Sequence, residues 1–221
     1  NGDLILTPLE PGKTVSIVRM DDQDNRERVE AHRYEALVSI RQIYGGPIEM
    51  LPSGEAQEIL EKAIEIIVND SFTIKNSDNC GGGLVQLPDN LTPIIIGDLH
   101  AQIDNLLKIL SENYLLESLY ANTACVVILG DAVHSEIAGE MEDMESSVVM
   151  MDLIFKLKCF FPDNIFYLRG NHDSFSPELS KNGISQGLLF EEKLKSLRGK
   201  GYVEAMNKLY ETLPYVVMNN N

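Results

Sequence analysis

The sequence predicts an α/β fold in which a largely parallel sheet lies between layers of helices. Two observations support this prediction. From residue 93 onward, short apolar runs of strand length alternate with longer amphipathic stretches, and such alternation requires crossover connections between parallel strands. Three of the apolar runs are followed within two residues by Gly-Asp or Gly-Asn, as expected where a chain turns sharply out of a sheet.

The first 75 residues are expected to form an arm and two helices that pack on the rest of the chain. Residues 1–25 hold short apolar runs split by prolines and then an acidic stretch, which favours a small hairpin or an arm. Residues 26–44 carry apolar side chains at near-helical spacing, so we expect a helix. A second helix is expected over 55–68, with Ser53 as its candidate N-cap.

Residues 76–221 are expected to form a second unit. Residues 76–90 are rich in Gly, Asn and Asp, which predicts a flexible connection. Beyond this connection the pattern predicts four strands and four helices. The strands are expected at 94–96, 125–129, 165–168 and 215–218, and the helices at 103–110, 144–160, 188–197 and 202–213.

Composition and charge exclude several classes of partner. The chain has 34 acidic and 18 basic residues, a formal charge of -16, which disfavours nucleic acid and anionic membrane surfaces and favours basic protein segments. No apolar run approaches the ~20 residues of a membrane helix, so we expect a soluble protein. The three cysteines lack metal-type spacing, which indicates a reducing, cytoplasmic compartment.

Three short segments place polar side chains directly after predicted buried strands. They are Gly97-Asp98-Leu99-His100, Gly130-Asp131-Ala132-Val133-His134 and Gly170-Asn171-His172-Asp173. Because the carboxyl ends of neighbouring parallel strands open into one crevice, these side chains are expected to converge. Taken singly, each segment could be a helix cap, a solvated loop or a turn. Their order along three strand ends is much harder to obtain by accident.

The residue types in these segments suit two metal ions. Asp98 and His100 are two residues apart, so in extended backbone they point the same way, toward one cation. Asp131 has two carboxylate oxygens and could bridge two cations ~3.5 to 4 Å apart, and Asn171 would add a neutral oxygen ligand to the second. Oxygen and imidazole ligands without thiolates suit manganese, with iron or zinc as alternatives.

With these motifs the sequence resembles the calcineurin-like metallophosphoesterases and, within them, the phosphoprotein phosphatase branch. The resemblance rests on GDLH at 97–100, GDAVH at 130–134 and LRGNHD at 168–173, and extends from about Ile59 to Met218. It implies metallophosphoesterase-type β-sheet layers flanked by helices, of which this chain would hold the N-terminal half plus a helical N-terminal extension.

The resemblance also implies a site and a reaction. The first metal would be held by Asp98, His100 and Asp131, and the second by Asp131 and Asn171. A hydroxide bridging the two cations would attack the phosphorus of a phosphoprotein monoester in line. His172 would then protonate the leaving oxygen, a contribution typically worth ~10² to 10⁴ in rate.

The second motif departs from the family pattern. Phosphoprotein phosphatases usually have Gly-Asp-x-x-Asp-Arg-Gly there, whereas this chain continues His134-Ser135-Glu136, so a carboxylate that supports the proton donor and an arginine that grips phosphate are missing. His134 could be a second acid, a substrate contact or a solvated loop residue. Arg169 could approach phosphate or pair inside the fold. The altered clamp could admit phosphotyrosine, whose aryl leaving group needs less acid assistance than serine.

A second departure concerns histidine. The family needs two further histidine ligands beyond Leu213-Pro214, whereas the four histidines of this chain are accounted for by the three motifs and by His32 in the first predicted helix. We therefore expect the catalytic domain to be incomplete in this chain. The sequence also looks similar to divergent bacterial members of the family, including some that are delivered into host cells. Delivery of this protein into another cell is therefore an alternative to a cytoplasmic location.

An acidic run precedes the helix expected at 144–160. Favourable interaction with the start of that helix is the simpler interpretation, and selection of basic phosphopeptides beside the cleft is the functional one. The run consists of Glu136, Glu140, Glu142, Asp143 and Glu145.

Two other functions compete with a protein phosphatase. A phosphodiesterase or nucleotide hydrolase could use the same metal cradle, because fold does not fix function. The LRGNH segment and Leu213-Pro214 favour the phosphatase branch. A catalytically silent scaffold is the other alternative, and retention of all five motif residues argues against it. These residues are Asp98, His100, Asp131, Asn171 and His172.

Overall fold

The computed structural model describes residues 22–75, 81–137, 139–178, 180–181 and 183–219. Most of the predicted N-terminal arm lies outside these residues, and its last four residues form the start of a helix. The unit boundary expected between residues 75 and 76 falls next to a segment outside the described residues, and it stays a prediction.

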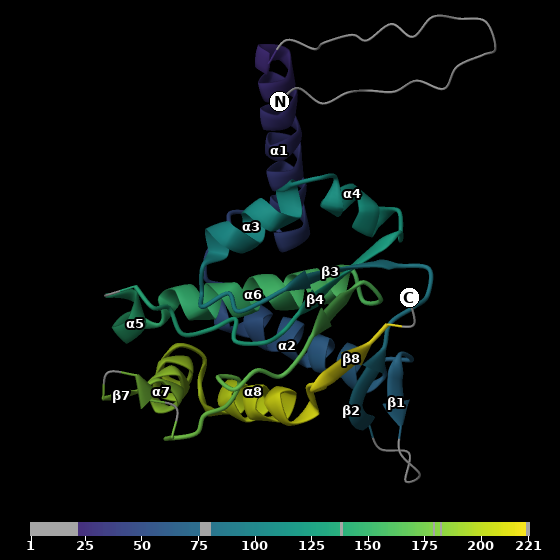
Figure 1. Ribbon diagram of the computed structural model, residues 1–221. Coiled ribbons are helices and arrows are strands. Elements are labelled where there is room, and N and C mark those ends of the chain that lie inside the picture. Colours follow the sequence, from purple (N-terminus) through teal and green to yellow (C-terminus); the bar gives the residue numbers. More distant parts are fainter. Residues whose placement is uncertain (1–21, 76–80, 138, 179, 182, 220–221) are drawn as a thin grey trace, which may run out of the picture.

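Both helices expected in the first 75 residues are present. They are α1 (Asp22–Tyr44) and α2 (Ser53–Val68). Ser53 is not the N-cap of α2, because Pro52 holds that position and the Ser53 hydroxyl instead donates to the main-chain oxygen of Arg198 at 3.5 Å. In Figure 1, α1 projects from the body, and it contacts α3 and α6.

Three of the four predicted strands form one parallel sheet. This sheet has the order β3-β4-β5 and consists of β3 (Thr92–Ile96), β4 (Ala124–Ile128) and β5 (Ile165–Tyr167). Its parallel register requires crossovers, which the helices between the strands provide. The three polar motifs therefore follow the carboxyl ends of three neighbouring strands and lie at the same end of the sheet.

The fourth predicted strand lies in a different sheet. β8 (Val216–Met218) pairs in parallel with β2 (Gly81–Gln86), and β2 pairs antiparallel with β1 (Thr73–Lys75). The prediction of a flexible connection over residues 76–90 is therefore wrong for 81–86. The strand could not be predicted, because its first three residues are glycines and its apolar run consists of Leu84 and Val85 alone.

The second sheet packs against one face of β4, and helices pack against the other. Val126 and Ile128 belong to the large apolar cluster formed with the helices, whereas Cys125 and Val127 belong to a second cluster shared with Val85. Alternate residues of a strand point to opposite faces, so β4 is buried on both. The order of layers is helices, first sheet and second sheet, which confirms β-sheet layers flanked by helices.

The remaining helices lie close to the predicted positions, and the shortest elements were missed. The helices are α3 (Ile103–Ser111), α4 (Leu115–Tyr120), α5 (Glu140–Asp143), α6 (Glu145–Phe160), α7 (Gln186–Arg198) and α8 (Lys200–Thr212). A two-stranded pair, β6 (Ser180–Lys181) and β7 (Ile184–Ser185), precedes α7. Elements of two to six residues are too short to show a period.

Within the described residues, β3 pairs only with β4 and forms an edge of its sheet. The amide of Thr92 donates to the oxygen of Thr123, and the oxygen of Ile96 accepts from the amide of Leu129. Because backbone groups alternate in direction along a parallel strand, Pro93 and Ile95 turn theirs away from β4. Proline, which has no amide hydrogen, is tolerated at this position because the sheet needs no hydrogen bond from it.

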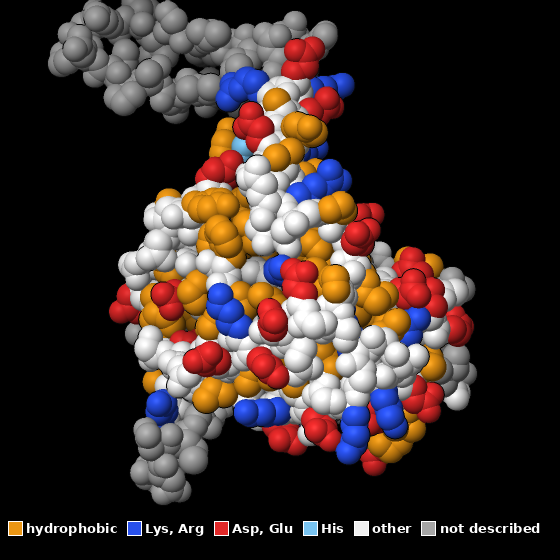
Figure 2. Space-filling view, turned by 180° about the vertical axis from the view of Figure 1, so that it is seen from behind, with side chains coloured by type: hydrophobic (Ala, Val, Ile, Leu, Met, Phe, Trp, Pro, Cys, Tyr) orange, Lys and Arg blue, Asp and Glu red, His pale blue; other side chains and the backbone are white. Residues whose placement is uncertain are grey.

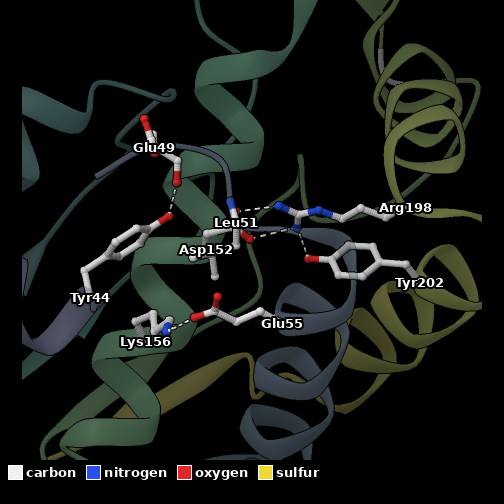
Figure 3. A network of polar contacts seen from close by, with 8 residues as sticks. All are labelled: Tyr44, Glu49, Leu51, Glu55, Asp152, Lys156, Arg198 and Tyr202. Carbon is white, nitrogen blue, oxygen red and sulfur yellow. Dashed lines mark hydrogen bonds and ion pairs between the residues drawn. The ribbon is translucent and has the colours of Figure 1, made fainter. Parts of the chain in front are cut away.

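A buried ion pair ties α6 to α7 and to the segment between α1 and α2. Arg198 donates from Nη1 and Nη2 to the Asp152 carboxylate at 2.7 and 2.5 Å, and from Nη1 to the Tyr202 hydroxyl at 2.7 Å. The amide of Leu51 donates to Asp152 at 3.1 Å. Figure 3 shows these groups together, with Tyr44 donating to the main-chain oxygen of Glu49 nearby. The N-terminal helices are therefore anchored to the rest of the chain.

Charged side chains of both signs are interspersed over the face drawn in Figure 2. The net negative charge is therefore not gathered into a single patch on that face. Among the described residues, no helix is both long and apolar enough to cross a membrane.

We predict that Arg198→Met lowers the free energy of unfolding by about 3–5 kcal/mol, because the buried Asp152 carboxylate loses its charged partner. The double variant D152L/R198M should recover part of this loss, since two apolar side chains leave no unpaired charge, although the Leu51 amide loses its acceptor. Urea denaturation measures both effects. The matched control is Lys200→Ala, which breaks an exposed ion pair with Glu204 and should change stability by about 0.5 kcal/mol or less. Equal losses in the control and in Arg198→Met would contradict the prediction.

Candidate metal centre and active site

The first motif leaves β3 and is tied to the second motif by main-chain hydrogen bonds. The amides of Leu99 and His100 both donate to the main-chain oxygen of Asp131, at 3.2 and 3.1 Å. The amide of Ala101 donates to the oxygen of Ala132 at 2.7 Å. His100 and Ala101 have φ values of 43° and 58°, so the extended geometry expected after Asp98 ends at His100.

Asp131 joins the second motif to the third. It is 6% exposed and has a left-handed backbone, with φ of 49°. Its Oδ1 accepts a hydrogen bond of 2.6 Å from the amide of His172. A Cβ on Gly170 would overlap the Asp131 carboxylate, and one on Gly130 would overlap the Gly170 backbone. The two strand ends therefore approach this closely only because both positions are glycine.

Asp173 helps to build this site, although the sequence analysis did not single it out. Its carboxylate is fully buried and accepts from the amides of Asp131 at 3.2 Å and Gly170 at 2.8 Å, and from the Tyr167 hydroxyl at 2.7 Å. Burial raises its pKa to about 6, although these hydrogen bonds favour the charged form. The acidic residue at the end of the third motif was the available signal. Its contacts tie the two strand ends together.

Three of the four histidines gather at this edge of the sheet. The ring centroid of His172 lies 5.7 Å from that of His100 and 5.4 Å from that of His134. His134 is 1% exposed, so the interpretation of it as a solvated loop residue is wrong. Burial, and then the electrostatic interaction with nearby His172, lowers the pKa of His134 to about 4. His32 lies apart on α1 and is bonded to Glu117 at 2.8 Å.

The other predicted site residues lie at the margin of this cluster. An Asp98 carboxylate oxygen is 3.8 Å from Nε2 of His100, and the Asp98 side chain is 60% exposed. Asn171 is exposed in the turn that follows Gly170. Arg169 donates from Nη1 to the hydroxyl of Tyr215 at 2.8 Å, which directs it toward β8 in this structure. A phosphate-binding role for Arg169 stays a prediction.

Most of the acidic run contacts the starts of helices or a nearby lysine. Glu142 accepts from the amide of Gly139 at 2.9 Å, and Asp143 accepts from the amide of Glu145 at 2.8 Å. Glu145 also pairs with Lys193 at 3.1 Å. The contact of Asp143 with the start of α6 supports the simpler interpretation, whereas Glu142 caps the shorter helix α5. Glu136 differs, because its Oε1 lies 4.0 Å from Nε2 of His100.

The donor atoms at this edge match the chemistry of a divalent metal centre. The buried Nδ1 atom of His100 has no hydrogen-bond partner, and such an unpaired nitrogen is suited to a ligand. Carboxylate, amide and imidazole groups converge here, whereas the two described cysteines lie elsewhere, in β4 and α6. As the described side chains stand, however, no group of three His, Cys, Asp or Glu is arranged to hold an ion.

We predict that Gly170→Ala lowers the free energy of unfolding by at least about 2 kcal/mol, because its Cβ would push the Asp131 carboxylate and backbone aside. Gly97→Ala is the matched control within the first motif, since a Cβ there meets nothing within 4 Å. It should cost less than about 1 kcal/mol. Denaturant unfolding measures the loss of stability in both variants. Equal losses would show that the contact between Gly170 and Asp131 leaves room for a Cβ.

Comparisons with known proteins agree with this fold. The family model described as calcineurin-like phosphoesterase matches residues 91–220. No curated protein matches the chain. The structure is similar to a solved protein serine/threonine phosphatase from Saccharomyces cerevisiae, described as similar to human phosphatase PP5, with a TM-score of 0.51 and 19% identity. The match covers 77% of this chain and 46% of the yeast chain, so this chain spans less than half of that relative. The family match covers more than half of the present sequence, and the chain therefore belongs to the calcineurin-like phosphoesterases.

Proposed function

We propose that this protein is a metal-dependent phosphatase that hydrolyses phosphate monoesters on proteins. The observation that supports it most strongly is the way in which Asp131 joins all three motifs. Its main-chain oxygen accepts from the first motif, its carboxylate accepts from the third, and its amide donates to Asp173. This arrangement holds the polar groups of three strand ends in fixed positions before a substrate binds. Fixed polar groups of this kind are what stabilises the charge that develops in a transition state.

We assign as metal ligands the same residues that the sequence indicated. Asp98, His100 and Asp131 would hold a first divalent cation, and Asp131 and Asn171 would contribute to a second. When bound, the two cations would activate water for attack and offset the negative charge of the phosphate. The donor set suits manganese, with iron or zinc as alternatives. Asp131 Oδ1 is already fixed by the His172 amide, which orients its carboxylate before any ion arrives.

We propose His172 as the general acid. Its backbone is held by the Asp131 carboxylate at 2.6 Å, and its ring lies among the site histidines. As the phosphorus–oxygen bond breaks, its electron pair goes to the leaving oxygen, and a proton from the His172 ring neutralises the charge. Positioned proton donors of this kind contribute about 10² to 10⁴ in rate.

The substrate is proposed to be a phosphorylated protein segment with basic residues near the phosphate. The formal charge of -16 supports a basic partner and disfavours polyanionic nucleic acid. Phosphotyrosine is included because Ser135 stands where the family has its phosphate-binding arginine, and because Arg169 is engaged with Tyr215.

We further propose that residues 76–221 are the N-terminal portion of the catalytic domain and that the first 75 residues support it. The contacts of α2 with α6 and α8, and the large apolar cluster that α1 and α2 share with β4, support this division of roles.

We predict that the full-length protein hydrolyses p-nitrophenyl phosphate when Mn²⁺ is added, and that chelation with EDTA abolishes the reaction. Asp131→Asn should lower kcat by at least about 10²-fold, because the predicted ligand to both cations loses its charge. Asp163→Asn, an exposed position after α6, is the matched control and should keep the activity. The absence of any metal-dependent turnover would favour a silent scaffold, and turnover of a phosphodiester alone would favour a phosphodiesterase.

A second prediction concerns the substrate. Phosphotyrosine peptides should be cleaved with a higher kcat/KM than matched phosphoserine peptides, because an aryl oxygen leaves with less help from a proton. Basic flanking residues should lower KM, and added salt should remove that advantage by screening. The measurement is phosphate release from four peptides that differ in the phosphorylated residue and in the flanks. A strong preference for phosphoserine would contradict the aryl preference.

A further inference from the structure

A surface groove runs between the C-terminal parts of α2 and α8. It consists of two hollows of about 450 and 430 Å³ that share the side chain of Val68. Val68 is the last residue of α2 and is 49% exposed. The two hollows are therefore continuous along the surface, and we call them together the α2–α8 groove. The apolar part of its lining includes Ile64, Ile67, Leu213, Pro214 and Tyr215.

The charged part of the lining is mainly acidic. Glu61 accepts a hydrogen bond of 2.6 Å from Nε2 of Gln57. Glu211 accepts one of 2.8 Å from Nδ2 of Asn207. Both donors are neutral amides, so they orient the carboxylates without cancelling their charge. The groove carries three carboxylates and one ammonium group, those of Glu61, Glu65, Glu211 and Lys208.

One end of the groove is joined to the third motif. The main-chain oxygen of Pro214, which lines the groove, accepts from the amide of Arg169 at 2.8 Å. The hydroxyl of Tyr215 accepts from Nη1 of the same arginine at 2.8 Å. Arg169 directly precedes Gly170, which packs against the Asp131 carboxylate. The groove therefore starts beside the motif that carries the proposed general acid.

Apolar walls combined with carboxylates suit lysine and arginine side chains. These side chains lay their aliphatic stems along apolar surface while their charged ends reach an acid. Glu61 and Glu65 are four residues apart in α2, so they lie on one face of the helix, about 6 Å from each other. Alternate residues of an extended peptide are roughly 6.6 Å apart. An extended segment with basic residues at alternate positions therefore matches the spacing of the two carboxylates, whereas an acidic segment would be repelled.

We propose that the α2–α8 groove binds a segment of the phosphoprotein substrate that has lysine or arginine at alternate positions. This rests on the proposed phosphatase function. With the phosphorylated residue at the metal centre, the substrate chain passes Arg169 and enters the groove at Tyr215. Its basic side chains then pair with the groove carboxylates. The groove selects substrates by their sequence near the phosphate, and the metal centre hydrolyses the ester.

The binding test needs neither metal nor turnover. It measures the fluorescence anisotropy of a labelled, unphosphorylated peptide with arginine at three alternate positions, added to the full-length protein at low salt. E65Q/E211Q should raise Kd about three- to tenfold, because two charge pairs are lost at exposed positions. Val68→Arg should raise Kd at least about tenfold, since a bulky cation enters the wall that both hollows share. A peptide with glutamate in place of arginine should not bind.

The matched control is E30Q/E35Q, which also removes two exposed carboxylates. These residues lie on α1, which projects on the side of the molecule opposite α8 (Figure 1). The control should leave Kd for the arginine peptide unchanged. Equal losses of affinity in E30Q/E35Q and in E65Q/E211Q would show that the overall negative charge attracts the peptide, and the proposal would be overturned.

The kinetic test uses the full-length protein with Mn²⁺ and phosphopeptides whose basic block begins at increasing distances from the phosphorylated residue. The wild-type protein should show its lowest KM at one spacing. E65Q/E211Q should raise KM at that spacing about three- to tenfold, while kcat and the hydrolysis of p-nitrophenyl phosphate stay unchanged. A KM that is the same at every spacing would mean that the groove is not occupied during hydrolysis, which contradicts the proposal.

Two further outcomes separate this proposal from its alternatives. If light scattering shows that Val68→Arg converts a dimer into a monomer, the groove holds a second copy of the chain and not a substrate. If the wild-type protein hydrolyses neither p-nitrophenyl phosphate nor any phosphopeptide, the proposed function fails. The anisotropy of the unphosphorylated peptide then still decides whether the groove binds a basic segment.

Discussion

The site depends on one buried carboxylate, that of Asp173. It accepts hydrogen bonds from two backbone amides on different strand ends and from the hydroxyl of Tyr167. Without it, the amides of Asp131 and Gly170 would lose their hydrogen-bond partner, and the bond from the His172 amide to the Asp131 carboxylate would remain as a tie between the second and third motifs. Because Asp131 also accepts from the first motif through its main-chain oxygen, this single side chain indirectly sets the positions of all three.

The layers of the fold explain why this tie can be so rigid. β4 carries the second motif and is buried on both faces, against the helices on one side and the second sheet on the other. Close packing on both faces leaves little room for a strand end to shift. The Asp152–Arg198 pair extends the same restraint to α7 and to the segment before α2. The left-handed backbone at Asp131 and His134 is held by these surroundings and not by local preference.

Long periodic elements and the three motifs could be predicted from the sequence, because burial of a strand or of a helix face leaves a clear pattern. The parallel sheet and the convergence of the motifs followed from that pattern. Partners that are distant in the sequence could not be predicted. Nothing local indicates that Leu84 and Val85 pair with β8, that Asp173 reaches Asp131, or that His134 turns inward beside His172. These outcomes are set by tertiary packing, which overrides a glycine-rich or loop-like composition.

The proline in β3 has a consequence for the behaviour of the protein in solution. An edge strand offers a row of backbone donors and acceptors to any other extended chain. The side chain of Ile95, which is 53% exposed, would add apolar contact area to such a pairing. Pro93 removes one donor from that row. Within the described residues, Pro93 therefore makes this edge less able to pair with another extended chain, at little cost to the sheet.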